Sequence, residues 1–596
     1  MRNPGDLFQK LIDEFVTECE IPASLVESFP EIRDLQYYHP GLKRFWNKDR
    51  GDISLNHTFY TEGRLISWKP SEDDPNRGKG VIRYQGGREE TKDVYVKTIH
   101  LLDPFAYLSG EYNEPPLELP GVAVSHNSRK KKLLDPNNQA YIDVIGMSIL
   151  SRLNEINITP HAVKVYGAVC GVKKSYMYDI TDEYETLKSR DWFWKIVGAG
   201  GENLHVKSKT GDNIEDEIIK NIKERSATYS SSGGPMYEDL DGCDGGEGST
   251  SDVSDGSLLE ELAPINLECS ELSDISFIAR RSGDNMTETG KSSATDDSLP
   301  YTIEVECRDM PVILLFEEAA DGTMDDILMD DDSIESSLLS DDGSSAEDAL
   351  VIMEIEKEEK WSAWFMQVVC ALTQMQSLLG MCHNDLHINN VVWTDTDVEF
   401  IMYKSISGDI WKVPTYGKMF KIIDFGRATF RIGKREFMSD DFLDGNEAAG
   451  QYNYGPCYNE DEDIIPSNPS FDLCRLSVSL IDSLYASTPA LRGKKKNRKI
   501  MMNEDGWIKY YTKSDLYNCL WKWMLDDNGH NILRDIDGED KFPGFDLYIY
   551  IASYVHNSVP KHQLEMKPFS VFKLDGGDSD DSGADGKTIA VNLYIE

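Results

Sequence analysis

Basic residues and long apolar runs are both scarce in this sequence. The 596 residues include 61 Lys and Arg against 105 Asp and Glu, and the formal net charge is −44 at pH 7. A surface this acidic repels phosphate backbones and anionic lipid, so we expect no nucleic acid as a partner and favour neutral or basic proteins. No apolar run approaches the roughly 18 residues that span a bilayer, so we expect no membrane partner.

Closely spaced cysteines are also missing. The ten cysteines are scattered and form no Cys-x-x-Cys pair, which gives a zinc site little support. The first 20 residues are polar and acidic, unlike a secretory leader. These features predict an intracellular protein with free thiols. The sequence does not predict the oligomeric state.

The chain is longer than the roughly 250–300 residues that one hydrophobic core usually supports. Residues 1–50 predict a helical extension, because Leu7, Leu11, Phe15 and Val16 recur at helical spacing. Strands dominate from 51 to 200. The pattern there predicts strands at 81–87 and 93–99, an exposed loop at 125–137, a helix at 139–156 and a strand at 161–169.

The composition changes sharply at 201–300. This segment is rich in Ser, Gly and acidic residues and poor in apolar ones, so it cannot offset the entropy cost of folding. We therefore predict a disordered acidic insertion there, and a smaller acidic patch at 330–348. Between them, 301–320 contains an apolar run that predicts one more strand.

Helices dominate the region 321–575. The strongest is expected at 361–379, where Trp361, Phe365, Val368 and Leu372 form one apolar stripe. The sequence further predicts short strands at 390–393 and 421–425, a hairpin within 396–418, helices at 471–486, 513–525 and 545–555, and a tail at 576–596. The predicted fold class is α+β.

Two short motifs carry the candidate chemistry. His383 to Asn390 read H-N-D-L-H-I-N-N between the strong helix and a strand, and Asp424, Phe425 and Gly426 follow the next strand. Asp385 can accept a proton from a hydroxyl group. Asn390 and Asp424 offer the hard oxygen ligands that Mg²⁺ prefers. Lys97 ends an alternating strand, where its ammonium could bind phosphate, although many strands end in a solvated lysine.

These motifs resemble the signature of protein kinases. By chance, H-x-D-L-x-x-x-N would arise about once in a few hundred chains of this length. The resemblance implies a bilobal fold with a β-rich N-lobe and an α-rich C-lobe, with ATP and Mg²⁺ between them. It also implies that Phe316 lies at the back of the ATP pocket and that Glu317 and Ala319 are hinge residues. Asp472 would then brace the loop at Asp385.

A closer similarity is to serine/threonine kinases of large nucleocytoplasmic DNA viruses. It is carried by the phrases YVKTIHLLDP (95–104), TPHAVKVYG (159–167), KVPTYGKMFKIIDFGRA (412–428), NPSFDLCRL (468–476) and FPGFDLY (542–548). It implies a viral enzyme of the host cytoplasm or of the virus particle.

The chain departs from the kinase pattern in several places. Gly78 and Gly80 are the best remnant of a glycine-rich loop that would cover the phosphates. The acidic partner of Lys97 is left open between Asp143 and Glu155. Asn384 stands where many kinases have an arginine that binds an activating phosphate, so we predict activity without that phosphorylation.

His387 stands where serine/threonine kinases usually have lysine, and it is a candidate catalytic residue near the γ-phosphate. No A-P-E motif follows Gly426. The sequence therefore predicts an ATP-dependent kinase acting on Ser or Thr of a protein, basic proteins being favoured. A small-molecule hydroxyl kinase and a nucleotide-binding pseudokinase scaffold stay open as alternatives.

Overall fold

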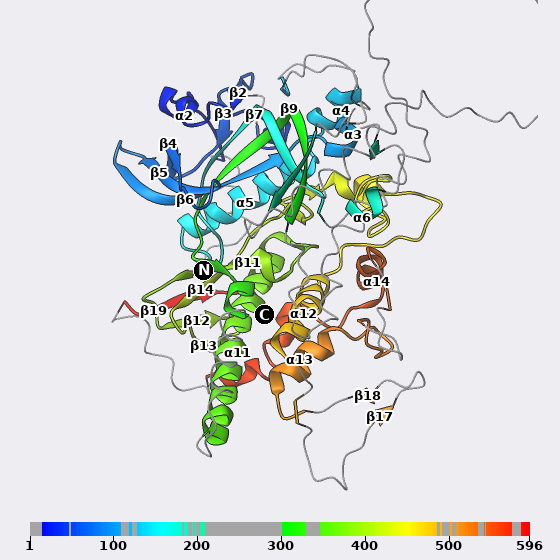
Figure 1. The fold of residues 1–596 in the computed structure, drawn as a ribbon. Helices are drawn as coiled ribbons and strands as arrows, with labels where there is room; N and C mark the ends of the chain where they lie inside the picture. The colour runs from blue at the N-terminus through cyan, green and yellow to red at the C-terminus, as the bar shows by residue number, and fades with distance from the viewer. Residues whose placement is uncertain are drawn as a thin grey trace, which may run out of the picture.

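A computed structural model describes residues 15–46, 49, 51–108, 112, 119–121, 128–181, 184–188, 193–194, 197, 203–208, 301–328, 346–485, 489–490, 501–502, 508–509, 512–533, 541–542, 544–574 and 586–595. The fold is of mixed α and β content. A large curled antiparallel sheet lies beside a part made mostly of helices (Figure 1). The candidate residues come from both parts.

The large sheet has seven strands in the order β2-β7-β9-β6-β5-β4, and β8 pairs with the outer end of β9. Its strands are β2 (Ile32–Gln36), β4 (Gly63–Pro70), β5 (Arg77–Tyr84), β6 (Glu89–His100), β7 (Val165–Asp179), β8 (Leu204–Ser208) and β9 (Tyr301–Glu318). The apolar run at 311–316 lies in β9, which is covered on both faces and is therefore apolar at successive positions. The helix α5 (Gln139–Glu155) lies under the sheet, on the side of the helical part (Figure 1).

Smaller elements surround this sheet. They are α2 (Ala23–Ser28), α3 (Pro104–Leu108), α4 (Ser128–Leu134), α6 (Tyr184–Leu187), the 3-10 helix η1 (Pro40–Arg44), and the strands β1 (Val16–Glu18) and β3 (His57–Phe59), which pair with each other. A second, smaller core lies around Phe193, Trp194 and Ile303, beside β8.

The helical part is organised on α11 (Ala346–Leu379). The other helices are α12 (Phe471–Leu484), α13 (Asp515–Trp523), α14 (Asp546–Tyr554) and α15 (Pro560–Gln563), with 3-10 turns η4 (Ile388–Asn390), η5 (Asp440–Phe442), η6 (Gly455–Cys457) and η8 (Phe569–Phe572). The predicted apolar stripe of the strong helix is buried, from Trp361 to Leu379.

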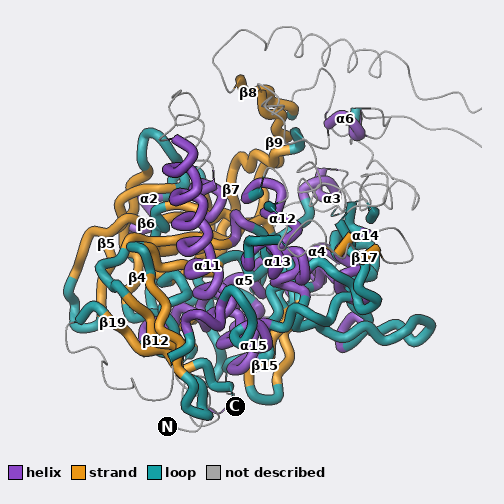
Figure 2. Tube along the Cα trace, turned by 90° about the horizontal axis from the view of Figure 1, so that it is seen from below, coloured by secondary structure: helices purple, strands orange, loops and turns teal. Residues whose placement is uncertain are grey.

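Four small sheets complete this part. β10 (Gly322–Thr323), β11 (Val391–Asp395) and β14 (Lys418–Ile422) form one; β13 (Ile410–Pro414), β12 (Phe400–Lys404) and β19 (Thr588–Asn592) form another; β15 (Thr429–Ile432) pairs with β16 (Arg435–Met438), and β17 (Met501–Met502) with β18 (Ile508–Lys509). β19 adds to β12 in parallel, and the two strands lie at the same edge of the molecule in Figure 2.

Several predicted elements are confirmed, most of them with ends shifted by a few residues, whereas the strong helix begins 15 residues before its predicted start at 361. They are the strands β5 and β6, the helices α5, α11, α12, α13 and α14, and the hairpin of β12 and β13. The cysteines of the described ranges are all unpaired. None of the described helices is both long and apolar enough to cross a membrane.

The structure differs from the predicted organisation in several details. The stretch 15–46 is not one helix but two short strands and two short helical turns, since prolines interrupt it at Pro22, Pro30 and Pro40. The predicted loop at 125–137 contains α4, in which Leu133 is buried. The insertion does not begin at 201, because β8 pairs with β9. The tail at 576–596 contains β19. Residues 1–14, 209–300 and 329–345 lie outside the described residues.

Candidate active site

A cleft of about 420 Å³ lies where the large sheet meets the helical part. Its apolar lining includes Val163, Val392 and Ile423. The charged residues that line it are Asp74, Arg77, Lys97, Glu317, Glu318, Asp321, Asp326 and Asp424. The cleft therefore offers apolar surface together with both charge signs.

Lys97 supplies a cation inside this cleft. In β6 it pairs with Leu315 of β9, and its side chain emerges on the cleft face. Its Nζ lies 2.7 Å from Oδ2 of Asp143 and 2.9 Å from Oδ1 of Asp424. Burial disfavours the charged form of Lys97, but these two carboxylates outweigh it and raise its pKa. The ammonium is thus held as a fixed positive charge.

Asp143 is the acidic partner of Lys97, and Glu155 is not. The Asp143 carboxylate is almost fully buried, and its second oxygen, Oδ1, accepts a hydrogen bond from the backbone N–H of Phe425 at 2.7 Å. Glu155 instead pairs with Arg152 and accepts from the backbone N–H of Glu62. Both oxygens of Asp143 therefore connect α5 to the site.

The loop that carries Asp385 is held from below by Asp472. The two oxygens of the buried Asp472 carboxylate accept from the backbone N–H groups of His383 (3.0 Å) and Asn384 (2.9 Å). The His383 ring pairs through Nε2 with the carbonyl oxygen of Ile423, just before Asp424. These bonds fix the loop relative to Asp424, as the predicted bracing role of Asp472 requires.

Asp385 has two partners that the sequence did not indicate. Tyr548 of α14 donates its hydroxyl hydrogen to Oδ1 of Asp385 at 2.9 Å, and Nη1 of Arg427 lies 3.8 Å from Oδ2. Burial opposes ionisation of Asp385, but Arg427 together with the nearby His387, Arg475 and His383 outweighs it, and the pKa lies below its ordinary value. Asp385 is therefore an oriented carboxylate beside the cleft rather than part of its lining.

Asn390 and Asp424 both line the cleft. The Asn390 amide nitrogen donates to the carbonyl oxygen of Asp385 at 2.9 Å, so its Oδ1 is the atom left for a cation. Asp424 has a φ of 66°, and its side chain is 43% exposed. Although the surrounding protein disfavours the charged carboxylate, the ammonium of Lys97 at 2.9 Å lowers the pKa of Asp424 to about 2.

These two oxygen-bearing side chains fit a magnesium ion. Mg²⁺ commonly uses one or two protein oxygens and takes its other ligands from water and phosphate. Within the described ranges no cluster of three or more His, Cys, Asp or Glu residues could hold a metal by itself.

His387 lies on the same loop but is not part of the cleft lining. Its Nδ1 is buried without a hydrogen-bond partner. Burial lowers the pKa of His387, although Asp385 opposes this shift. With a lowered pKa, His387 does not supply the permanent positive charge that a lysine would have at this position.

Phe316 does not lie at the back of the cleft, which corrects the sequence prediction. Side chains alternate along a strand, and Phe316 faces away from Lys97, stacking on Phe29 with ring centroids 5.7 Å apart. Glu317 takes the cleft face instead; it pairs across the sheet with Tyr95. Its carboxyl group is only 5% exposed, and burial raises its pKa to about 8.

Ala319 is also misassigned as a residue that presents its backbone to a ligand. Its N–H donates to the carbonyl oxygen of Asp93 at 3.3 Å. The next residue, Ala320, lines the cleft.

Gly78 and Gly80 do not form a phosphate loop. Both lie within β5, paired with β4 and β6. A Cβ atom on Gly78 would lie 2.1 Å from the carbonyl oxygen of Lys69, so glycine is required by strand packing. The β4–β5 connection at 71–76 is acidic, and it brings Asp74 and Arg77 to the cleft.

Arg427 links Asp385 to the segment that follows Asp424. Its Nη2 lies 2.7 Å from Oε2 of Glu447, and its Nε lies 3.6 Å from Oδ2 of Asp441. Nearby, Tyr452 donates its hydroxyl hydrogen to Oδ1 of Asn384. The sequence analysis missed Arg427; the signal that could have found it is its place directly after the D-F-G motif.

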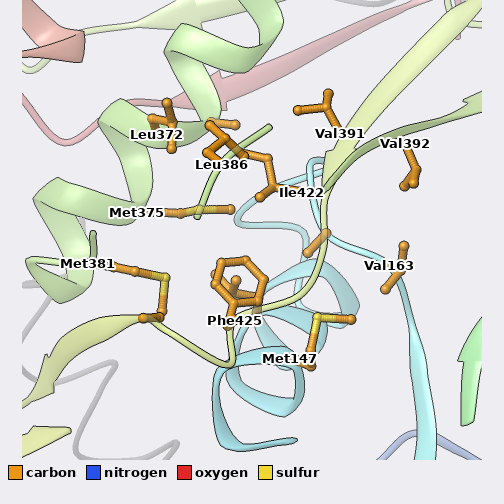
Figure 3. Close-up of a cluster of buried hydrophobic side chains, with 14 of the residues drawn as sticks. Met147, Val163, Leu372, Met375, Met381, Leu386, Val391, Val392, Ile422 and Phe425 are labelled. Carbon is orange, nitrogen blue, oxygen red and sulfur yellow. The ribbon is translucent and has the colours of Figure 1, made fainter. Parts of the chain in front are cut away.

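Figure 3 shows how Phe425 is packed: its ring lies among Met147, Met375 and Met381. Gly146 of α5 makes this possible, because a Cβ atom there would lie 2.8 Å from Cβ of Phe425. The close approach brings the N–H of Phe425 within reach of Asp143.

Comparison with known proteins adds no assignment. The chain matches no protein-family model and no curated protein.

Proposed function

We propose that this protein is an ATP-dependent protein kinase that phosphorylates Ser or Thr, with a bilobal fold. The large sheet with α5 would be the N-lobe, and the part built on α11 the C-lobe. The observation that carries the proposal is the meeting of Lys97, Asn390 and Asp424 in one cleft, with Asp385 hydrogen-bonded to Asn390. These residues belong to segments far apart in the sequence.

Each residue suits one task of phosphoryl transfer, which depends mainly on positioning and charge stabilisation. Lys97, held between two carboxylates, would orient the ATP phosphates. Asn390 and Asp424 would hold Mg²⁺, which neutralises phosphate charge when bound. Asp385, oriented by Tyr548, would accept the proton of the substrate hydroxyl.

The remaining surface of the cleft suits a nucleoside. Val392 and Ile423 offer an apolar surface for a base, and Ala320 and Glu318 line the same cleft. The high net negative charge favours a basic protein as the substrate.

The test is ATP turnover by the full chain, with basic proteins, small alcohols and sugars offered in parallel. We expect phosphate transfer to protein Ser or Thr, and a loss of several powers of ten in Asp385→Asn, each power worth about 1.4 kcal/mol of barrier. Transfer to small alcohols alone would show a small-molecule kinase.

A nucleotide-binding scaffold is the second candidate, and one observation favours it. The connection at 71–76 would lie near the phosphates, yet it contributes the carboxylate of Asp74 instead of a glycine-rich cradle. In that case Mg-ATP would raise the melting temperature while wild type and Asp385→Asn would turn over equally little.

A further inference from the structure

The turn η1 lies between two elements that determine the geometry of the candidate site. On one side it approaches α5: a Cβ atom on Gly41 would lie 2.9 Å from Cδ1 of Ile145. His39, the residue just before η1, stacks on Tyr141 with ring centroids 5.1 Å apart. Contact with α5 is therefore close.

On its other side the same segment contacts the hairpin of β15 and β16. Phe45 stacks on Phe437 with centroids 5.4 Å apart and planes 16° apart. Arg44 donates from Nη1 to the carbonyl oxygen of Glu436 at 3.2 Å, and its guanidinium lies 4.7 Å from the centroid of the Phe437 ring. Stacking and a hydrogen bond thus join this turn to β16.

Both contacted elements lead to the candidate site. α5 carries Asp143, which holds Lys97 and the N–H of Phe425. β15 begins at Thr429, which exchanges two backbone hydrogen bonds of 2.9 Å with Cys382, the residue before His383. A shift of α5 relative to β16 would strain the contacts of Asp143.

The segment is itself firmly packed. Phe45 also contacts Phe15 (5.1 Å) and Phe59 (5.4 Å) between ring centroids, and Leu42 is fully buried. Phe15 and Phe59 belong to the region of the β1–β3 pair. The segment is thus part of the hydrophobic core.

We propose that residues 39–45, the brace, hold α5 against the β15–β16 hairpin and so keep Asp143 in place for its pair with Lys97. Arg44 and Phe45 are positioning residues, since they act through α5 and the hairpin. The expected effect on turnover rests on the proposed function, whereas the link that the brace makes between α5 and the β15–β16 hairpin does not.

The test compares full-length wild type with Phe45→Ala, Phe437→Ala and the double variant. Hydrogen exchange is followed in 139–155 and 429–438, together with kcat and KM for ATP. We expect faster exchange in both segments and a fall of about tenfold in kcat/KM for each single variant, equivalent to about 1.4 kcal/mol. The double variant should lose little more than either single variant.

Phe29→Ala is the matched control. Phe29 is a buried ring of the same N-terminal region, but it stacks on Trp68 and Phe316, away from α5 and the hairpin. It should lower stability without faster exchange in 429–438. Should Phe45→Ala fail to fold, Arg44→Gln is tested in its place. Arg44→Lys keeps the positive charge, but it should recover only part of the wild-type exchange protection, because the hydrogen bond from the guanidinium to the carbonyl oxygen of Glu436 has a defined geometry.

The outcomes separate the two proposals. Unchanged exchange in both segments would overturn the brace, as would equal effects of Phe29→Ala and Phe45→Ala. An inactive wild type whose exchange still responds to Phe45→Ala would overturn the kinase proposal and leave the brace standing.

Discussion

Asp143 accepts the backbone N–H of Phe425 at 2.7 Å through Oδ1 while its Oδ2 holds the ammonium of Lys97. One buried carboxylate thus connects a helix, a strand of the large sheet and the D-F-G motif. In the proposed kinase, this single group sets the distance between the phosphate-binding cation and the metal-binding carboxylate.

Removal of this carboxylate should therefore cost more than a surface ion pair. Asp143→Ala leaves the partly buried ammonium of Lys97 with Asp424 as its remaining partner, so the cost should lie below the about 3–5 kcal/mol of a buried charge left unpaired. We expect a melting temperature lower than that of wild type and ATP turnover reduced at least a hundredfold, with a smaller loss in Asp143→Asn. Glu155→Gln is the matched control and should retain turnover. An equal loss of turnover in Asp143→Ala and Glu155→Gln would contradict the assignment of Asp143 as the partner of Lys97.

The hydroxyl of Tyr548 should set the pH dependence of Asp385. A hydrogen bond donated to a carboxylate stabilises its charged form, so Tyr548→Phe should raise the pKa of Asp385. The base would then be protonated at higher pH, and the acidic limb of the kcat profile should move upward in pH. At pH 8 the rate should fall less than tenfold. A uniform loss at every pH would indicate a purely structural role.

Glu317 should make stability depend on pH. Its folded pKa of about 8 lies above the ordinary value of 4.5, so its contribution to stability falls as pH rises between these values. The groups around it are Lys97, Asp143 and Asp424. Glu317→Gln cannot ionise and should be more stable than wild type at pH 8, on the order of a few kcal/mol. Denaturant melts at pH 5 and pH 8 measure the difference, which should be small at pH 5.

Gly146 should be sensitive to the smallest substitution. Alanine favours a helix by roughly 1 kcal/mol over glycine, but its Cβ would lie 2.8 Å from Cβ of Phe425. We expect Gly146→Ala to displace Phe425, weaken its bond to Asp143 and lower turnover at least tenfold. Ser148→Ala, a second substitution on the same helix, serves for comparison. A gain in stability with unchanged turnover would refute the clash.

Phosphatase treatment should leave the proposed enzyme active. Glu447 already places a carboxylate 2.7 Å from Arg427, the kind of contact that an added phosphate makes elsewhere. We expect Glu447→Gln to lower turnover several-fold, while Glu460→Gln at an exposed position does not. Mass spectrometry confirms complete dephosphorylation before the assay. Loss of all activity on dephosphorylation would contradict the prediction.

Periodicity predicted the long elements well. The stripe from Trp361 to Leu379 and the alternation before Lys97 are local patterns, and the structure confirms α11 and β6. Prediction was wrong where side-chain direction decided the outcome. A displacement of one residue reverses every side chain of a strand, so Glu317, and not Phe316, faces the cleft.

The sequence by itself determined which residues we propose for phosphoryl transfer, because Asp385, Asn390 and Asp424 lie in short motifs of fixed spacing. Only the tertiary structure decided their partners. Tyr548 lies 163 residues from Asp385 in the chain, and Phe425 lies 282 from Asp143. Contacts over such separations depend on how helices and strands pack, which local spacing does not encode.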